Sequence, residues 1–471
     1  MSKFSEKCKE LLVENGSNVY RISKSASLER TTLQRMVTGR RIPNIDFVKT
    51  FCKALRLSLS EEQELMRLYK MEVIGEATYK SQESILHLFQ HLAELEKSNM
   101  QLSRNVIQNG DLVLVSPLAR HPYDTDLLVH YIFQNVLHSE KDSFIYTNLP
   151  SESPLLLQYL SHFISKSSGK VLVKQLVFFH SNVADIYVNL EILSQILPLC
   201  FLENISYEPC YYYRKFINTD QEYSLYPYYI ITPDHVLQLS SDLKRSILHS
   251  EQQLVQHYQE EFEHIMVHSS PLIYKPDSME AAMEKYFGST PREIFTLESS
   301  LCDSDLFSTD MLQQLAQKYF SSASSIPQNY TDMVAQLLRS SQRSSFFTRQ
   351  GAEVFCKTGM GSGTSGFLFS PLDPAFRAKA LQHFLSTYSH SEKTMLNDDF
   401  IFPQTLYVEL RDNYILYFIL MNQNQQLSFI SITENSICNA FYEFFQLLRK
   451  SEYVCPPEEI TTLITEFLNK L

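Results

Sequence analysis

Apolar side chains recur at helical spacing through the first seventy residues, which predicts a set of short packed helices. The breaks between them carry residues typical of helix ends: Asn15-Gly16 follows the first helix, and Asn44 stands where an N-cap is expected. The predicted apolar stripes are Cys8, Leu11 and Leu12; Val19, Ile22 and Ser23; Leu33, Met36 and Val37; and Ile45, Val48, Phe51, Cys52 and Leu55, before a fifth helix from Ser60 to Tyr69.

The third predicted helix, within residues 28–37, has an outer face made of hydrogen-bonding side chains. The apolar stripe turns one face of this helix toward the core, and Gly39 supplies a helix C-terminal stop. The opposite face is therefore free to contact another molecule. The residues on that outer face are Arg30, Thr31, Gln34 and Arg35.

Farther along the chain, helical and strand patterns alternate, which predicts an α/β region over residues 106–270. Continuously apolar runs such as 171–179 are typical of strands covered on both faces. The predicted strands are 112–115, 144–147, 171–179, 205–216 and 229–239, and the predicted helices are 126–137, 155–164, 186–197 and 241–268.

The last two hundred residues predict a helical segment over 271–345 and an α+β domain over 346–471. Strands at 405–410, 414–421 and 427–433 form a predicted antiparallel meander, followed by helices at 438–448 and 458–468. No internal repeat of 20–50 residues is evident. The expected fold is multidomain: an all-α five-helix domain over 1–70, a connecting or dimerisation helix over 71–105, and then mixed α/β and α+β regions.

The connecting segment carries one apolar stripe at helical spacing, formed by Ile85, Leu88, Phe89, Leu92 and Leu95. Such a stripe suits a dimer seam, and it equally suits a helix docked on its own chain. The sequence leaves both interpretations open.

Charge divides the chain unevenly. Residues 1–70 hold 14 Lys and Arg against 8 Asp and Glu, a formal charge of +6, so the net charge of −12 leaves −18 for residues 71–471. Between residues 20 and 41, six cations face a single acid, Glu29. A local basic patch on an acidic protein indicates a module that binds a polyanion, although a solvated helical face would show the same charges.

The run 19–57 resembles the lambda-repressor-like, Cro-type (XRE family) helix-turn-helix, a resemblance that covers about residues 5–70. Ile22-Ser23 matches the hydrophobic and small pair of the first motif helix, Ser27 the turn residue, and Leu28 the buried residue before the recognition helix. The family usually has Gly where Ser27 stands, and Ser or Thr where Glu29 stands.

This resemblance implies that the third helix enters the major groove of double-stranded DNA. An Arg fork can bond a guanine edge there, and a Thr methyl can pack on thymine. The implied base-reading residues are Arg30, Thr31, Thr32, Gln34 and Arg35, with Arg30 and Arg35 the main readers, and the expected phosphate contacts are Lys24, Arg40 and Arg41. The alternative for the last two is a pair of solvated surface arginines.

Tyrosines are dense between residues 207 and 229, next to Arg214. Tyr211, Tyr213 and Arg214 are a candidate effector pocket for an anionic or aromatic molecule. Strands also favour tyrosine for packing, so a purely structural role fits the same residues.

No pattern of catalytic residues emerges, and we expect no enzyme activity, no cofactor and no metal site. Residues 361–366 match GxGxxG, but the Phe367-Leu368-Phe369-Ser370-Pro371 that follows cannot start the helix that holds a pyrophosphate. The eight cysteines show no CxxC pair, which predicts free thiols in a reducing compartment. The longest apolar runs span about eight residues, too short to cross a membrane.

These features predict a cytoplasmic transcriptional regulator that binds double-stranded DNA, forms a homodimer and senses a small-molecule or peptide effector through its larger part. The alternative is a cytosolic enzyme or phosphate-ligand protein in which the helix-turn-helix serves autoregulation, with the glycine-rich loop near its site.

Overall fold

The computed structural model describes residues 2–98, 116–137, 143–151, 153, 155–163, 171–202, 205–213, 225–301, 306–319, 342–361, 371–389, 392–421 and 427–470. The chain divides into two compact units, Met1–Glu83 and Ser84–Leu471. An all-helical N-terminal region is followed by two mixed sheets with interspersed helices, which confirms the expected fold class of an α part followed by α/β parts.

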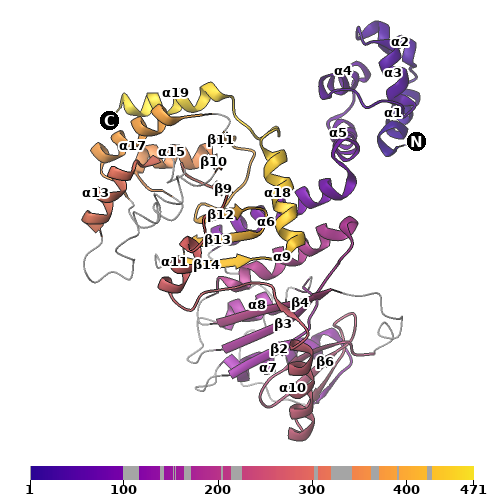
Figure 1. Cartoon of the computed structure of the whole chain (residues 1–471). Coiled ribbons are helices and arrows are strands. Elements are labelled where there is room, and N and C mark those ends of the chain that lie inside the picture. Colours follow the sequence, from indigo (N-terminus) through magenta and orange to yellow (C-terminus); the bar gives the residue numbers. More distant parts are fainter. Residues whose placement is uncertain are drawn as a thin grey trace. The chain divides into compact units, whose positions relative to one another are not determined.

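The five predicted N-terminal helices form close to their expected positions (Figure 1). Side chains at their starts satisfy backbone N–H groups, as local capping requires. Asn18 and Asn44 each accept a backbone hydrogen bond at 3.0 Å, and Ser58 forms a capping box with Glu61. The helices are α1 (Lys3–Glu14), α2 (Val19–Ser25), α3 (Arg30–Val37), α4 (Ile45–Leu55) and α5 (Leu59–Ile74).

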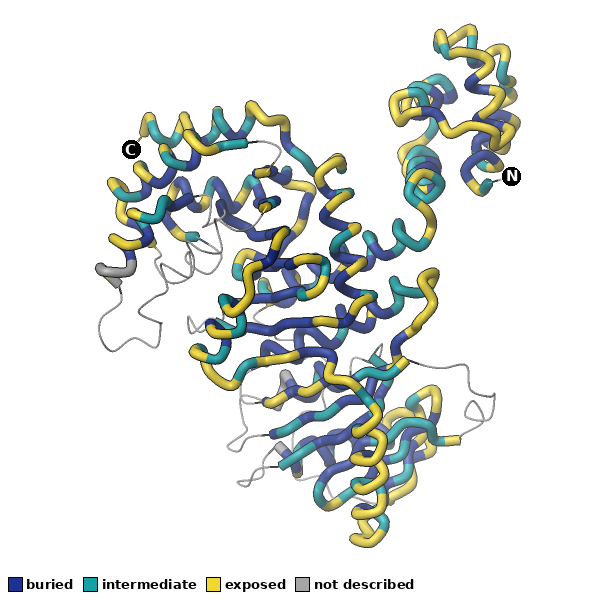
Figure 2. The backbone as a smooth tube through the Cα atoms, viewed as in Figure 1, coloured by how far each residue is buried: buried dark blue, intermediate teal, exposed yellow. Residues whose placement is uncertain are grey.

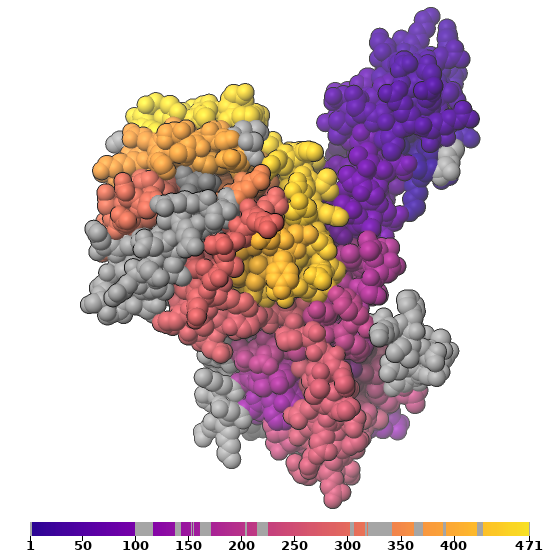
Figure 3. Space-filling view, viewed as in Figure 1, coloured from indigo at the N-terminus to yellow at the C-terminus, as the bar shows by residue number. Residues whose placement is uncertain are grey.

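These helices bury a core of their own and form a continuous body in the space-filling view (Figure 3). Phe4 packs edge-on against Tyr69 with ring centroids 5.5 Å apart, and the Tyr69 hydroxyl donates to the Pro43 carbonyl at 2.9 Å. Most of the predicted inward residues are buried, Val19 and Ser23 are half-buried, and Ile45 is 39% exposed, so the placement of Ile45 in the core stripe was wrong. Ile45 is the first residue of α4, where the chain has only begun to pack.

Helix α6 (Glu76–Lys97) carries the apolar stripe of the connecting segment, and the structure decides between its two interpretations. All five stripe residues are buried. Phe89 alone contacts four rings, those of Phe400, Phe402, Phe441 and Phe444, with centroids 5.1–6.4 Å apart. The stripe is therefore a core face of the second unit and is not available as a dimer seam.

The first sheet has eight strands in the order β1-β7-β6-β5-β2-β3-β4-β8. Its centre is parallel, β2 with β3 and β3 with β4, whereas β5, β6 and β7 form an antiparallel meander beside β2. The strands are β1 (Leu118–Ala119), β2 (Ser143–Thr147), β3 (Val171–Phe179), β4 (Ile205–Tyr213), β5 (Tyr228–Ile231), β6 (Val236–Leu239), β7 (Ser246–His249) and β8 (Ser270–Pro271).

Helices cover both faces of this sheet. α7 (Pro122–Leu137), α8 (Leu155–Phe163) and α9 (Ile186–Cys200) pack on one face, and α10 (Gln252–Met266) packs on the other. Apolar side chains from each helix meet apolar strand residues there, which is why the strands are largely dark blue in Figure 2.

Two predictions in this region were wrong. The predicted strand 229–239 is the hairpin of β5 and β6, because Pro233 and Asp234 place a turn in its middle. The predicted helix 241–268 is β7 followed by α10, and Leu243 adopts a positive φ of 57° in the turn that leads into β7. The predicted strand 112–115 lies outside the described residues.

The second sheet has six strands in the order β11-β10-β9-β12-β13-β14. The predicted meander is confirmed as β12, β13 and β14, but β9 lies within the stretch predicted to be helical, which corrects that prediction. The strands are β9 (Glu293–Glu298), β10 (Gln342–Thr348), β11 (Lys393–Leu396), β12 (Leu406–Arg411), β13 (Ile415–Met421) and β14 (Leu427–Ile432).

Helix α18 (Asn435–Leu448) covers one face of the second sheet and contacts α9, which packs on the first sheet. The other face is covered by α11 (Met279–Phe287), α13 (Thr309–Tyr319), α15 (Arg349–Thr358), α17 (Pro374–Thr387) and α19 (Pro457–Leu468). Gly351 in α15 lies so close to the β9 end that a Cβ there would stand 1.9 Å from the Ser299 carbonyl oxygen.

The two sheets repeat one topology. Each sheet contains three parallel strands in chain order, β2-β3-β4 in the first and β9-β10-β11 in the second. On the other side of β2 and of β9 lies a three-stranded antiparallel meander, β5-β6-β7 and β12-β13-β14 respectively. The register also agrees: Thr147 of β2 pairs with Ile230 of β5, and Thr296 of β9 pairs with Glu409 of β12, after the similar segments Ile145-Tyr146-Thr147 and Ile294-Phe295-Thr296. The second unit is thus built from two copies of the same α/β arrangement.

One stretch, Val183–Cys200, is long and apolar enough to pass a test for membrane-spanning helices, with a mean hydropathy of 1.3. It includes α9, whose apolar residues pack against the first sheet and against α18. The apolar character of α9 is accounted for by its place in the core.

Candidate nucleic-acid interface

The connection between α2 and α3 is a tight turn held by backbone geometry. Ser27 adopts a left-handed conformation with φ of 54°, and the Leu28 N–H donates to the Ser23 carbonyl at 3.0 Å. A left-handed residue here explains why glycine suits this position in the family that the sequence resembles. Ser27 satisfies the same geometry at a conformational cost.

The start of α3 is fixed by side chains. Glu29 is the N-cap but makes no side-chain bond to the helix backbone; its carboxylate instead accepts a hydrogen bond from the Thr32 hydroxyl. The Arg41 Nη1 donates to the same hydroxyl oxygen at 3.4 Å. Thr32 is buried, so its prediction as a base-reading residue is wrong: its hydroxyl is used inside the domain.

The outer face of α3 is solvent-exposed. Arg30, Thr31, Gln34 and Arg35 are all exposed, as the sequence predicts, and they share one side of an eight-residue helix. The Arg30 guanidinium lies 5.6 Å from the centre of the Tyr20 ring, which extends from α2 and is 57% exposed. A ring in this position limits the conformations of the Arg30 side chain.

The chain leaves α3 through a glycine turn that keeps the next two arginines close to the helix. Gly39 has φ of 71°, and the Arg40 N–H donates to the Arg35 carbonyl at 2.8 Å. Arg40 and Arg41 are exposed, as is Lys24 at the end of α2. The expected phosphate-contact residues therefore come from the two helix ends that flank the outer face of α3.

These cations have no acidic partners among the residues that the structure describes. The salt bridges of the first unit involve other residues, such as Arg67 with Glu64 at 2.8 Å and Lys7 with Glu10 at 3.0 Å. The cluster that we call the basic face consists of Arg21, Lys24, Arg30, Arg35, Arg40 and Arg41, all exposed. Their charges remain available to an external polyanion.

Two of the three residues of the candidate effector pocket, Tyr211 and Tyr213, lie in the described part of the chain. The Tyr213 hydroxyl donates to the carboxylate of Glu434, the N-cap of α18, so this tyrosine ties the first sheet to the second. Burial, together with Glu434, raises the pKa of Tyr213. Tyr211 packs against Phe179 and Tyr213 at centroid distances of 5.1 and 5.6 Å. Arg214 lies outside the described residues, as do residues 362–366 of the glycine-rich loop.

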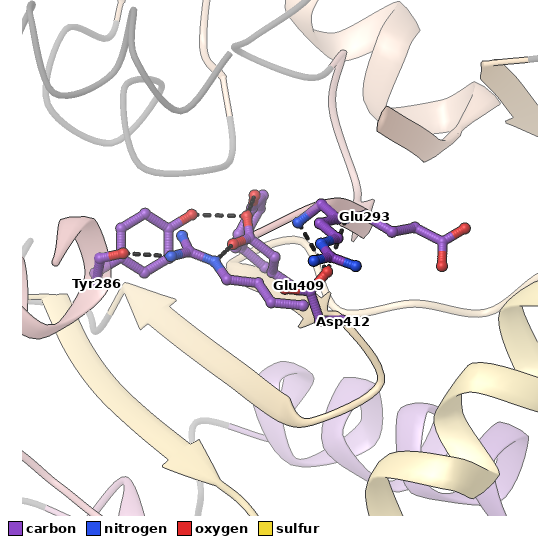
Figure 4. Close-up of polar contacts among 7 residues, drawn as sticks. Tyr286, Glu293, Glu409 and Asp412 are labelled. Carbon is purple, nitrogen blue, oxygen red and sulfur yellow. Dashed lines mark hydrogen bonds and ion pairs between the residues drawn. The ribbon is translucent and has the colours of Figure 1, made fainter. Parts of the chain in front are cut away.

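The second sheet contains a buried polar cluster that the sequence did not predict. Glu409 and Arg411 of β12 form an ion pair with exposed fractions of 0% and 1%, and the Tyr286 hydroxyl donates to Glu409 at 2.7 Å (Figure 4). Tyr407 also donates to Glu409, and the Arg411 guanidinium lies 4.0 Å from the Tyr286 ring centre. Alternation along β12 could have indicated that these residues share one face; their burial depends on helices far away in sequence.

The charges of this cluster are mutually stabilised. Burial alone would raise the pKa of Glu409, but Arg411, Arg343 and the tyrosine hydroxyls together hold it below its ordinary value. In the first sheet the position paired like Glu409 is Ile230, so the fold itself accepts an apolar residue there. The cluster is a specific feature of the second copy.

The seven cysteines within the described parts of the chain are free and buried, in agreement with the sequence prediction; Cys302 lies outside them. Burial raises the pKa of their thiols, that of Cys52 to about 11 and that of Cys356 to about 12. Thiols held in this protonated form are poor nucleophiles.

No family model matches the chain, and no curated protein matches it.

Proposed function

We propose that this chain is a DNA-binding transcriptional regulator whose α3 reads bases in the major groove and whose second unit senses an effector or supports a homodimer. The observation that carries the proposal is the basic face: six exposed cations, with no acidic partner in the described part of the chain, lie on and beside an exposed helix face of hydrogen-bonding side chains.

The roles divide by position. Arg30 and Arg35 stand on the outer face of α3, where a guanidinium can bond two acceptors of a guanine edge. Arg40 and Arg41 follow the helix end and Lys24 ends α2, where they suit phosphates on either side of the groove. Thr31 and Gln34 add shorter contacts to base edges.

The remaining charge supports this division of labour. Residues 1–70 carry +6 and residues 71–471 carry −18, so the larger part repels a nucleic acid while the helical part attracts it. A duplex is therefore expected to approach through the first unit alone.

The test is the salt dependence of duplex binding by the full chain, measured by fluorescence anisotropy at several salt concentrations. Each phosphate contact removed should flatten the slope of log K against log salt by about one unit. We expect this change for Arg40→Ala and for Arg41→Ala, with similar losses of affinity for all sequences.

Lys53→Ala is the matched control, because Lys53 is exposed on α4 and lies outside the basic face. Its slope should equal that of the parent. Parent slopes in both arginine variants would remove these residues from the phosphate contacts, and a parent chain that binds no duplex at low salt would end the proposal.

A further inference from the structure

The second unit contains a partly enclosed cavity of about 100 Å³ at the carboxyl end of β2. Its polar lining comes from one loop and four elements: the loop after β2, the helices α6, α8 and α9, and the strand β3. The polar residues are His91, Ser151, Ser153, Gln158, Gln175 and Gln195, and leucine and isoleucine side chains of α8 and α9 complete the wall.

The place of this cavity in the sheet is one where ligands commonly bind. β2 is the first strand of the parallel set, with β3 and β4 on one side of it and the antiparallel β5 on the other. In open α/β sheets, ligands bind outside the carboxyl ends of the parallel strands.

Some polar groups of the cavity wall already have hydrogen-bond partners within the protein, and others do not. Gln175 is buried; its amide donates to the Leu149 carbonyl at 2.9 Å and its oxygen accepts from Tyr207 at 2.5 Å. Among the described residues, the Gln195 amide and the Ser151 hydroxyl have no hydrogen-bond partner. A polar cavity with unused donors and acceptors favours a ligand that supplies them.

His91 adds an acceptor. Its Nδ1 lies 3.2 Å from the Ser194 carbonyl, which can only accept, so Nδ1 carries the proton in this contact. The neutral ring then leaves Nε2 as an acceptor. Among the described residues, the wall contains no Lys, Arg, Asp or Glu, so a carboxylate or phosphate beside them would be desolvated without a compensating charge.

We propose that this cavity binds a small neutral heterocycle with adjacent N–H and C=O groups, the chemistry of a pyrimidine base such as uracil. The Gln195 amide presents the complementary pair of groups, and the aliphatic side chains suit the ring faces. A closed cavity of about 150 Å³ holds one benzene ring, so this smaller, partly open cavity of about 100 Å³ has room for no more than a single ring and none for a purine.

The ligand would act on the helix that the two units share. His91 belongs to α6, whose residues up to Glu83 belong to the first unit and whose remainder lies in the core of the second. A change in the contacts of His91 therefore changes the environment of this helix, and this regulatory step rests on the proposed function.

Isothermal titration calorimetry of the full chain with uracil tests the site. We expect saturable binding of uracil, no binding of orotate, which adds a carboxylate to the same ring, and about tenfold weaker uracil binding in Gln195→Leu. Gln253→Leu, an exposed position on α10, should bind as the parent does. Ser151→Ala, a smaller and less disruptive change, should also weaken uracil binding. Circular dichroism checks that each variant is folded.

The proposal fails if uracil gives no heat of binding at millimolar concentration, if glucose binds in its place, or if Gln195→Leu and Ser151→Ala both bind like the parent. Duplex binding by the ligand-free chain is measured alongside. Failure of uracil binding with intact duplex binding refutes this site alone, and loss of duplex binding with intact uracil binding refutes the proposed function alone.

Discussion

Replacing Ser27 by glycine should stabilise the helix-turn-helix. Ser27 holds a φ of 54°, in the left-handed region where an L side chain costs about 1–2 kcal/mol. Glycine removes that cost but loses about 0.5–1 kcal/mol through the greater freedom of the unfolded chain. The Ser27 side chain is exposed, so no core contact is lost. The expected net gain is about 1 kcal/mol, or about a fivefold smaller population of opened molecules.

Hydrogen exchange of the full chain measures this effect where it arises. The amides of Leu28 and Leu33, bonded at 3.0 Å to the carbonyls of Ser23 and Glu29, report on the turn and on α3. They should exchange about five times more slowly in Ser27→Gly, because their exchange requires this unit to open. Ser27→Ala keeps a Cβ and should exchange like the parent. Equal rates in the glycine variant and the parent would show that the turn carries no such cost.

Three further changes have expected outcomes. Phe89→Ala removes a ring that is fully buried among four others and should destabilise the second unit by about 3–5 kcal/mol in urea denaturation. Glu409→Gln leaves Arg411 as an uncompensated buried charge and should lower the free energy of unfolding by about 3–5 kcal/mol. Because the pKa of Glu409 is lowered in the folded state, the parent keeps this contribution above the ordinary Glu pKa of about 4.3 and loses it as the pH falls through the lower folded pKa. Thermal melts below pH 4 should therefore depend less on pH in the variant. Leu33→Asp places a charge in the helical core and should abolish duplex binding in the anisotropy assay, together with the slow exchange of α3 amides.

The helices of the first unit could be predicted because their signals are local. Asn18, Asn44 and Ser58 cap helices within three residues of their own position, and the apolar stripes need only the helical period. Thr32 was misplaced because its type favours the surface, whereas its hydroxyl is satisfied by Glu29 and by the more distant Arg41.

Longer-range pairing explains the remaining differences. β9 and β7 each become a strand through partners elsewhere in the chain, β9 through β10 and β12, and β7 through β6 and β1. The repeated topology of the two sheets is hidden for the same reason: Ile230 and Glu409 occupy matching places with unrelated side chains. The cavity near Gln195 is equally invisible in sequence, because four separate elements form it.

Selection of binding sites from a randomised duplex library tests the central claim, that α3 reads bases, most directly. If Arg30 and Arg35 each bond a guanine edge, each contact contributes about 1–3 kcal/mol of discrimination at one base pair. Arg30→Ala and Arg35→Ala should each relax the preference at a different position, with nonspecific binding at low salt nearly unchanged, and the buried-site variant Thr32→Val should select the parent site. If both arginine variants select the parent site with the parent's stringency, α3 does not read bases and the account is contradicted.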